Sequence, residues 1–98
     1  MSIKNRERDV ESRLVSSLKK IGLQCLKFDP TNCVGMPDRM ILLPDARVIW
    51  VEVKTDSGHL EEIQKLRHQE LKRLGHRVEV VWSAEDVDRV IGEIKEAL

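Results

Sequence analysis

The amino-acid sequence predicts an α/β protein in which one mixed β-sheet is flanked by helices, with the element order α-β-β-β-α-β-α. Three observations lead to this class. Apolar residues recur at helical spacing in three segments, short runs rich in β-branched residues lie between them, and turn-forming residues gather at the junctions. At 98 residues the chain has the length of one domain, and we expect residues 1–98 to form it.

The first half of the chain predicts one helix and three strands. The helix over residues 4–21 ends at Gly22 and rests on apolar residues at helical spacing, namely Val10, Leu14, Leu18 and Ile21. A short strand, "LQCLKF", and a loop, "DPTNCVGMP", come next. The runs "RMILL" and "RVIWVEVK" are separated by Pro44-Asp45-Ala46, a pattern typical of a β-hairpin.

The second half predicts a helix, a strand and a last helix. Residues 59–74 carry leucines and isoleucine at helical spacing before Gly75, namely Leu60, Ile63, Leu66, Leu71 and Leu74. "RVEVVW" is the next strand. Ser83 then caps the helix "SAEDVDRVIGEIKEAL", whose acidic first turn suits the helix dipole.

Charge and cysteine content limit the class of protein. The 17 basic residues equal the 17 acidic ones, so no net positive field indicates a nucleic-acid partner, although a local basic patch is compatible with the count. Cys25 and Cys33 are too few for a disulfide framework or a zinc site. The N-terminal segment has no signal-peptide core and no run spans a bilayer, so we expect a soluble, reduced cytoplasmic protein without a membrane partner.

Chemistry is expected at the end of the strand from Arg47 to Lys54. Alternation places Ile49, Val51 and Val53 on one face and Val48, Trp50, Glu52 and Lys54 on the other. Both faces begin apolar, as in a central strand that is buried on both sides. Glu52 and Lys54 interrupt this pattern. Taken alone, a Glu-x-Lys pair is most often a solvated ladder of charges at a strand end.

The hairpin gives this pair a third partner. With the three-residue loop Pro44-Asp45-Ala46, Leu43 faces Arg47, and counting back along the antiparallel ladder sets Asp38 opposite Glu52. A two-residue loop would instead set Asp38 opposite Val53, on the wrong face, so the functional interpretation requires the longer loop or a bulge.

Two carboxylates at one place repel each other unless a cation or a proton compensates. A hard divalent ion such as Mg²⁺ or Mn²⁺ meets this need through oxygen ligands and keeps several waters. Lys54 beside it would orient a water or stabilise charge on a phosphate, and the ion lowers the pKa of water. This set of groups suits phosphodiester hydrolysis.

These motifs resemble a known family. Pro37-Asp38, thirteen further residues and Glu52-Val53-Lys54 are similar to the PD-(D/E)xK nuclease signature. Gly35-Met36-Pro37-Asp38-Arg39 and the segment from Gly58 to Gln64 resemble its VRR-NUC branch, with Glu61 in place of the serine usual there. Glu11, eleven residues before Gly22, matches the glutamate of that branch's first helix. The resemblance implies a restriction-endonuclease-like fold.

The resemblance also implies roles for individual residues. Asp38 and Glu52 would hold the metal with the backbone carbonyl of Val53, and Lys54 would assist the attacking water. Glu11 would reach the site directly or through a metal-bound water, and Gln64 would orient the lysine or the water. The expected catalytic set is therefore Glu11, Asp38, Glu52, Lys54 and Gln64, with the metal held by Asp38, Glu52, Val53 and Glu11.

Three further residues are candidates for contact with DNA. Lys27, in a short strand, would contact a phosphate or simply occupy a strand edge, and His59 lies near the proposed site. Arg39 would pair either with the acid cluster or with a phosphate. Trp50, Trp82 and the apolar face of the last helix are expected to be core.

The function implied is a Mg²⁺- or Mn²⁺-dependent endonuclease that acts on branched DNA such as Holliday junctions as a homodimer. Two alternatives stay open. One is a non-catalytic or partner-dependent DNA-binding module with a nuclease fold, which the neutral net charge favours. The other is an exonuclease or restriction-type nuclease, which the motifs do not separate from junction cleavage.

Overall fold

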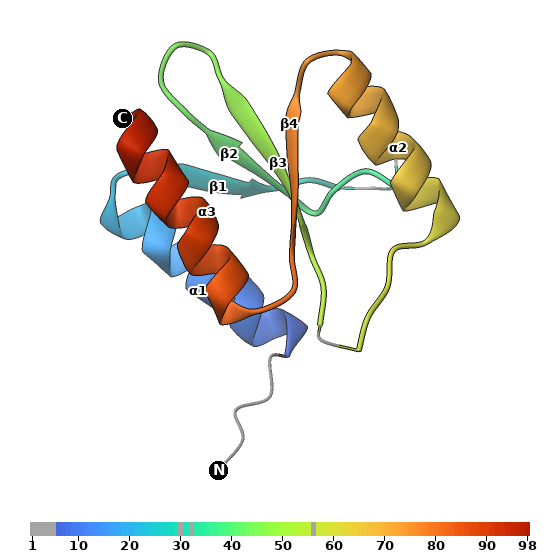
Figure 1. Ribbon diagram of the computed structural model, residues 1–98, viewed down its shortest axis with the longest axis horizontal. Helices are drawn as coiled ribbons and strands as arrows, with labels where there is room; N and C mark the ends of the chain where they lie inside the picture. Colours follow the sequence, from blue (N-terminus) through green and yellow to red (C-terminus); the bar gives the residue numbers. More distant parts are fainter. Residues whose placement is uncertain (1–5, 30, 32, 56) are drawn as a thin grey trace.

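The computed structural model describes residues 6–29, 31, 33–55 and 57–98. Its element order is the one that the sequence predicts, α-β-β-β-α-β-α, shown in Figure 1. The elements are α1 Glu7–Lys20, β1 Gln24–Lys27, β2 Arg39–Leu42, β3 Val48–Val53, α2 Glu62–Arg73, β4 Arg77–Val81 and α3 Ala84–Ala97. α1 and α2 each begin three residues later than predicted, at Glu7 instead of residue 4 and at Glu62 instead of residue 59. Residues 4 and 5 of the predicted first helix lie outside the described residues.

The four strands form one mixed sheet in the order β1-β2-β3-β4. β1 pairs with β2, and β2 with β3, in antiparallel directions. β4 pairs with β3 in parallel, because α2 carries the chain back to the starting end of the sheet. β3 is therefore a central strand, and every residue from Ile49 to Val53 is buried, as the apolar beginning of both of its faces predicts.

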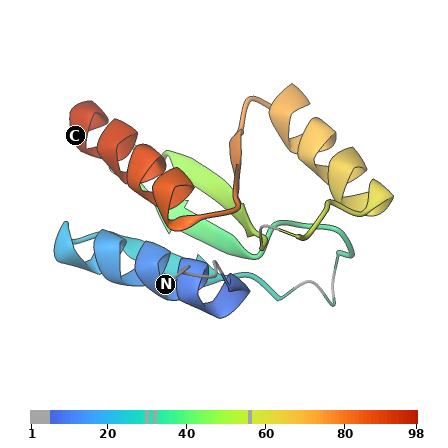
Figure 2. The ribbon, with the colours of Figure 1, turned by 60° about the horizontal axis from the view of Figure 1, so that its bottom comes forward.

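One face of the sheet is covered by α1 and α3, which lie side by side in both views (Figures 1 and 2). The apolar stripes of the two helices meet the inward residues of the strands and form the main core. Its members are Val10, Leu14, Leu18, Ile41, Ile49, Val51, Val53, Val81, Val87, Val90, Ile91 and Ile94. The predicted core face of the last helix is confirmed.

None of the helices in the described part of the chain is long and apolar enough to cross a bilayer.

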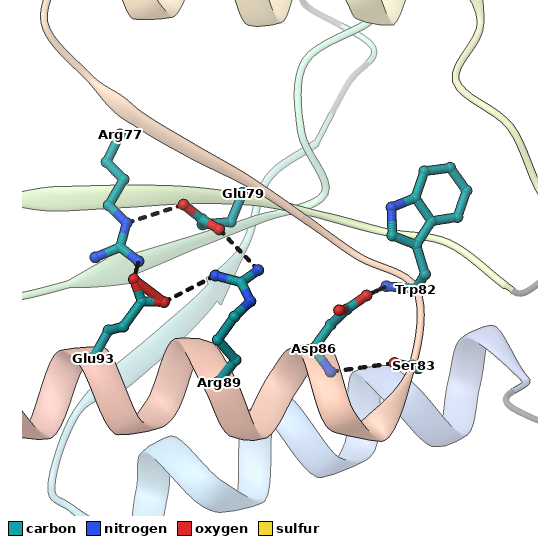
Figure 3. A network of polar contacts seen from close by, with 7 residues as sticks. All are labelled: Arg77, Glu79, Trp82, Ser83, Asp86, Arg89 and Glu93. Carbon is teal, nitrogen blue, oxygen red and sulfur yellow. Dashed lines mark hydrogen bonds and ion pairs between the residues drawn. The ribbon is translucent and has the colours of Figure 1, made fainter.

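The start of α3 is fixed directly at the end of β4 (Figure 3). The Ser83 hydroxyl accepts a hydrogen bond from the Asp86 amide at 3.2 Å, which confirms the predicted cap, and the Asp86 carboxylate accepts one from the Trp82 amide at 2.8 Å. Further along, Glu79 of β4 and Glu93 of α3 are bridged by two arginines, Arg77 and Arg89, at 2.8–3.2 Å. This network joins α3 to β4 without using any candidate site residue.

The other face of the sheet is covered in part by α2, which lies on the side away from α1 and α3 (Figure 2). α2 buries His68 and Leu71, whereas Ile63, Leu66 and Leu74 are more than a third exposed. The leucine spacing thus predicted the helix correctly but not the side it buries. Trp50 is buried on this face. The rings of Phe28 and His76 lie edge-on to its ring, with centroid distances of 5.5 and 6.2 Å.

Candidate active site

The β2–β3 hairpin has the register that the three-residue loop predicts. The Leu43 amide donates to the Arg47 carbonyl at 2.9 Å, and the ladder continues through Leu42 facing Val48 to Arg39 facing Val51. One further step sets Asp38 against Glu52. The loop closes through Asp45 and Ala46, which both have positive φ, 63° and 59°. The geometric condition for two converging carboxyl groups is therefore met.

Asp38 is held at this position from both sides. Its backbone carbonyl accepts a hydrogen bond from the Phe28 amide at 2.8 Å, and its carboxylate Oδ2 accepts one from the Val53 amide at 3.0 Å. The side chain therefore binds directly to the backbone of the strand that carries Glu52. A bond of this kind to a carboxylate is stronger than a neutral one and fixes the direction of the group.

The loop before Asp38 rests against α2. Gly35 has a φ of +90°, and a Cβ at this position would lie 2.8 Å from the Ile63 carbonyl oxygen. The Arg67 guanidinium donates to the Val34 carbonyl at 3.0 Å. Glycine is therefore required both for the backbone conformation and for the close approach. The first residue of the "GMPDR" motif fixes the loop on the helix, and its fourth is the carboxylate that faces Glu52.

Glu52 is a buried acid rather than a solvated strand end. Its side chain is 2% exposed. Burial, a hydrogen bond to the Asp38 carboxyl group and the charge of Asp38 together raise the pKa of Glu52 to about 8, outweighing the Lys54 ammonium. With protein groups alone, the pair therefore shares a proton at neutral pH. The alternative of an exposed ladder of charges is wrong for Glu52.

Two cationic or imidazole groups face the two oxygens of Glu52. Lys54 Nζ lies 3.8 Å from Oε2, and His68 Nε2, from α2, lies 3.9 Å from Oε1. Burial lowers the pKa of His68, as do the charges of Lys72 and Lys54. Because the imidazole is held neutral and the carboxyl group protonated, the contact between His68 and Glu52 is polar rather than an ion pair.

Arg39 forms an ion pair with Glu11, with 3.1 Å between Nε and Oε2, and donates a second hydrogen bond to the Cys25 carbonyl at 3.3 Å. The sequence left open whether Arg39 pairs with the acid cluster or with a phosphate. The structure pairs it with Glu11, the acid that α1 contributes to the predicted metal set. This ion pair with Arg39, the first residue of β2, thus holds Glu11 against the sheet. The acid of α1 whose charge acts on Glu52 is Glu7, one turn earlier.

The remaining candidates lie around this centre. The Gln64 amide oxygen accepts a hydrogen bond from the Glu61 amide at 2.8 Å, so Gln64 forms part of the cap of α2 instead of contacting Lys54. His59 is exposed and lies 3.7 Å from the Glu61 carboxylate. Lys27 is exposed and faces Arg39 in the β1–β2 ladder.

The donor set suits a hard divalent cation. Asp38 and Glu52 supply two carboxyl groups that lie close enough together to share a hydrogen bond. Within the described residues no group of three or more His, Cys, Asp or Glu side chains is placed to hold a metal ion together. Magnesium is commonly held by only one or two carboxylates, with water and substrate phosphate completing the shell. Asp38, Glu52 and the carbonyl of Val53 would hold the ion here.

A hollow of about 420 Å³ lies at the opposite end of the hairpin. It is lined mainly by apolar side chains, among them Leu43, Val48, Leu74 and Ile94, and by no carboxylate. The two converging carboxyl groups lie instead at the Asp38–Glu52 end.

Sequence reasoning missed two residues near the carboxyl pair, Glu7 and His68. Glu7 had a signal, because it lies four residues before Glu11 and therefore on the same face of the helix. His68 lies four residues after Gln64 and three before Leu71, on one face of α2, but no sequence signal marked this face as the buried one.

Comparisons with known proteins identify the family of this chain. The family model described as "VRR-NUC domain" matches residues 2–85. A protein of Acyrthosiphon pisum secondary endosymbiont phage 1, described as "Putative nuclease p44", is 35% identical over 86 residues, which are 88% of this chain and 91% of the phage protein. A solved structure described as "VRR_NUC domain" superposes with a TM-score of 0.80 at 26% identity, covering 88% of this chain and 94% of that one. The sequence match and the shared fold together show that this chain belongs to the VRR-NUC domain family.

Proposed function

We propose that this VRR-NUC nuclease is a Mg²⁺- or Mn²⁺-dependent endonuclease that hydrolyses phosphodiester bonds in branched DNA as a homodimer. The observation that carries the proposal is the pairing of Asp38 with the buried Glu52 beside Lys54. Two carboxyl groups that cannot both ionise alone are matched to a divalent cation. The nuclease relative and the family model support the same class of reaction.

Each residue of the site has a distinct task in this mechanism. Asp38, held by the Val53 amide, and Glu52, held in the buried strand, supply ligands that keep their direction. The bound cation would neutralise charge on the phosphate and lower the pKa of water. The Lys54 side chain, 18% exposed, reaches the solvent side, where its ammonium orients water and stabilises negative charge on the phosphate.

Contact with DNA is proposed for Lys27 and His59, which are exposed. Arg39 is 16% exposed and committed to Glu11 and Cys25, so its proposed part is to fix α1 against the sheet. The ion pair with Arg39 then connects Glu11 to the sheet that carries the site. Gln64 is connected to the site indirectly, by its hydrogen bond at the start of α2.

Dimerisation and the preference for branched DNA rest on the family resemblance. The exposed apolar side chains on α2 and on the loop before β2, Ile63, Leu66 and Val34, are compatible with a second copy covering them. Two-fold symmetry would supply one site for each of two strands. Light scattering that finds only an 11.3 kDa species at assay concentration would remove the two-site proposal.

The test is cleavage of a four-way junction, a flap and a linear duplex with Mg²⁺, Mn²⁺ or EDTA. Lys54→Ala is expected to lose metal-dependent incision while its circular dichroism and metal affinity are kept. Lys65→Ala is the matched control, because Lys65 is an exposed lysine of α2 paired with Glu62. If Lys65→Ala loses as much activity as Lys54→Ala, the assigned role of Lys54 is wrong.

The neutral net charge of the chain favours a second candidate, a DNA-binding module without turnover. Binding of the same DNAs without cleavage in either metal would support it. Cleavage from free ends of the linear duplex alone would indicate an exonuclease, and cleavage of intact duplex at defined sequences a restriction-type enzyme. The substrate panel therefore separates every alternative.

A further inference from the structure

Glu52 Oε1 and His68 Nε2 form an unusual buried pair. Both atoms are buried, both lack a hydrogen-bond partner, and they lie 3.9 Å apart. Within the described residues, Trp50 Nε1 is the only other buried side-chain atom of this kind. Buried polar atoms are normally bonded, and an unsatisfied one costs about 1–3 kcal/mol. Two such atoms pointing at each other indicate a bond that forms when the site is in its working arrangement.

The two oxygens of Glu52 have different surroundings. Oε2 lies on the side of Lys54, whereas Oε1 lies on the side of His68. The imidazole comes from α2, whereas Asp38 comes from the start of the β2–β3 hairpin. An N–H donated to Oε1 would stop the carboxylate from turning about its last bond. It would thereby decide which oxygen is presented beside Asp38 and Lys54.

We propose that His68 is a positioning residue for Glu52, and that its Nε2–H donates to Oε1 so that Oε2 faces the cation. The inference rests on the proposed function, because it assigns a support to one of the proposed metal ligands. Hydrogen-bonded partners behind metal ligands typically raise metal affinity about 10- to 100-fold. His68 touches neither substrate nor metal in this assignment, and acts through Glu52.

The experiment measures Mn²⁺ affinity by electron paramagnetic resonance of free Mn²⁺, without DNA and without turnover. His68→Leu keeps the bulk but removes the donor, and is expected to weaken binding about 10- to 100-fold. His68→Gln supplies an amide N–H of similar reach, and is expected to restore most of that affinity. Leu71→Ala, at the next buried position of α2, is the control for packing and is expected to lose stability while keeping affinity.

The results separate this inference from the proposed function. If the wild-type protein binds no Mn²⁺, or if Asp38→Asn leaves binding unchanged, the proposed metal site itself is wrong. If the wild-type protein binds Mn²⁺ and folded His68→Leu binds it equally well, the positioning role alone is overturned. Loss of affinity in His68→Leu together with equal loss in Leu71→Ala would also overturn it, because packing would then explain both.

A measurement on the unaltered protein keeps the inference testable if His68→Leu does not fold. Nitrogen-15 NMR of the His68 ring identifies the nitrogen that carries the proton and follows it during addition of diamagnetic Mg²⁺. The inference requires the proton on Nε2 and a shift of that N–H when Mg²⁺ binds. A proton on Nδ1 alone, or an Nε2–H signal that Mg²⁺ leaves unmoved, would refute it.

Discussion

Replacing Glu52 with glutamine is expected to stabilise the protein at alkaline pH while abolishing metal binding. The amide has nearly the shape of the carboxyl group, carries no charge, and donates to the Asp38 carboxylate in place of the shared proton. Glu52 is buried in the central strand, so its ionisation is opposed by burial and by Asp38. The substitution removes this opposition without opening a cavity.

The size of the effect follows from proton linkage. The pKa of Glu52 is about 8 in the folded protein instead of the ordinary 4.5. Between these values the folded state keeps a proton that the unfolded state has lost, so stability falls as the pH rises through this window. Each pH unit is worth about 1.4 kcal/mol, and the whole window amounts to about 5 kcal/mol. Such a loss is a large share of the stability of a small domain.

The assay is urea denaturation in EDTA at about pH 5, pH 7 and pH 9. Glu52→Gln should match the wild-type protein near pH 5 and exceed it by several kcal/mol near pH 9. When Mn²⁺ replaces EDTA, the difference in the free energy of unfolding between the two proteins should become smaller. Mn²⁺ stabilises only the protein that retains the carboxylate, by about 2.7 kcal/mol at one hundred times its Kd. Parallel pH profiles for the two proteins would refute the assignment of Glu52 as a buried, proton-sharing acid.

Two further substitutions test the surroundings of the site. Gly35→Ala should lower the free energy of unfolding by about 2 kcal/mol, because the new methyl group would lie 2.8 Å from the Ile63 carbonyl oxygen at a φ of +90°. Gly92→Ala, in open space on α3, should instead raise the free energy of unfolding by about 0.5–1 kcal/mol. If urea denaturation gives a change of the same sign for both variants, the packing described for the Gly35 loop is wrong. For the cysteines, burial raises the pKa of Cys25 to about 11. In a Cys33→Ser variant, Cys25 should therefore be alkylated at pH 8 about 100-fold more slowly than in urea, and mass spectrometry that finds equal rates would refute it.

The hairpin was predictable because its geometry is set locally. The loop Pro44-Asp45-Ala46 fixes the pairing of Leu43 with Arg47, and the two-residue period of strands then carries the register to Asp38. The burial of Glu52 was not predictable in the same way. A charged residue at a strand end is usually solvated, and the burial here depends on α2, which packs on this face from a distant part of the chain.

The helices show where the sequence signal ends. Spacing along α1 brings Glu11 to the sheet, but the rotation of the helix decides that it meets Arg39, while Glu7 acts on Glu52. In α2 the leucine stripe suggested one buried side, whereas packing on β4 selects His68 and Leu71. Helix rotation depends on many small contacts between layers, and no short motif encodes it.

The hydrogen bond from the Val53 amide to Asp38 also makes the backbone a reporter of the chemistry. The chemical shift of that amide proton depends on the charge and position of the carboxylate it meets. A single peak in a nitrogen–proton correlation spectrum would therefore register events at Asp38 without any label, substrate or substitution. The hydrogen-exchange rate of the Val53 amide would measure how often its hydrogen bond to the Asp38 carboxylate breaks.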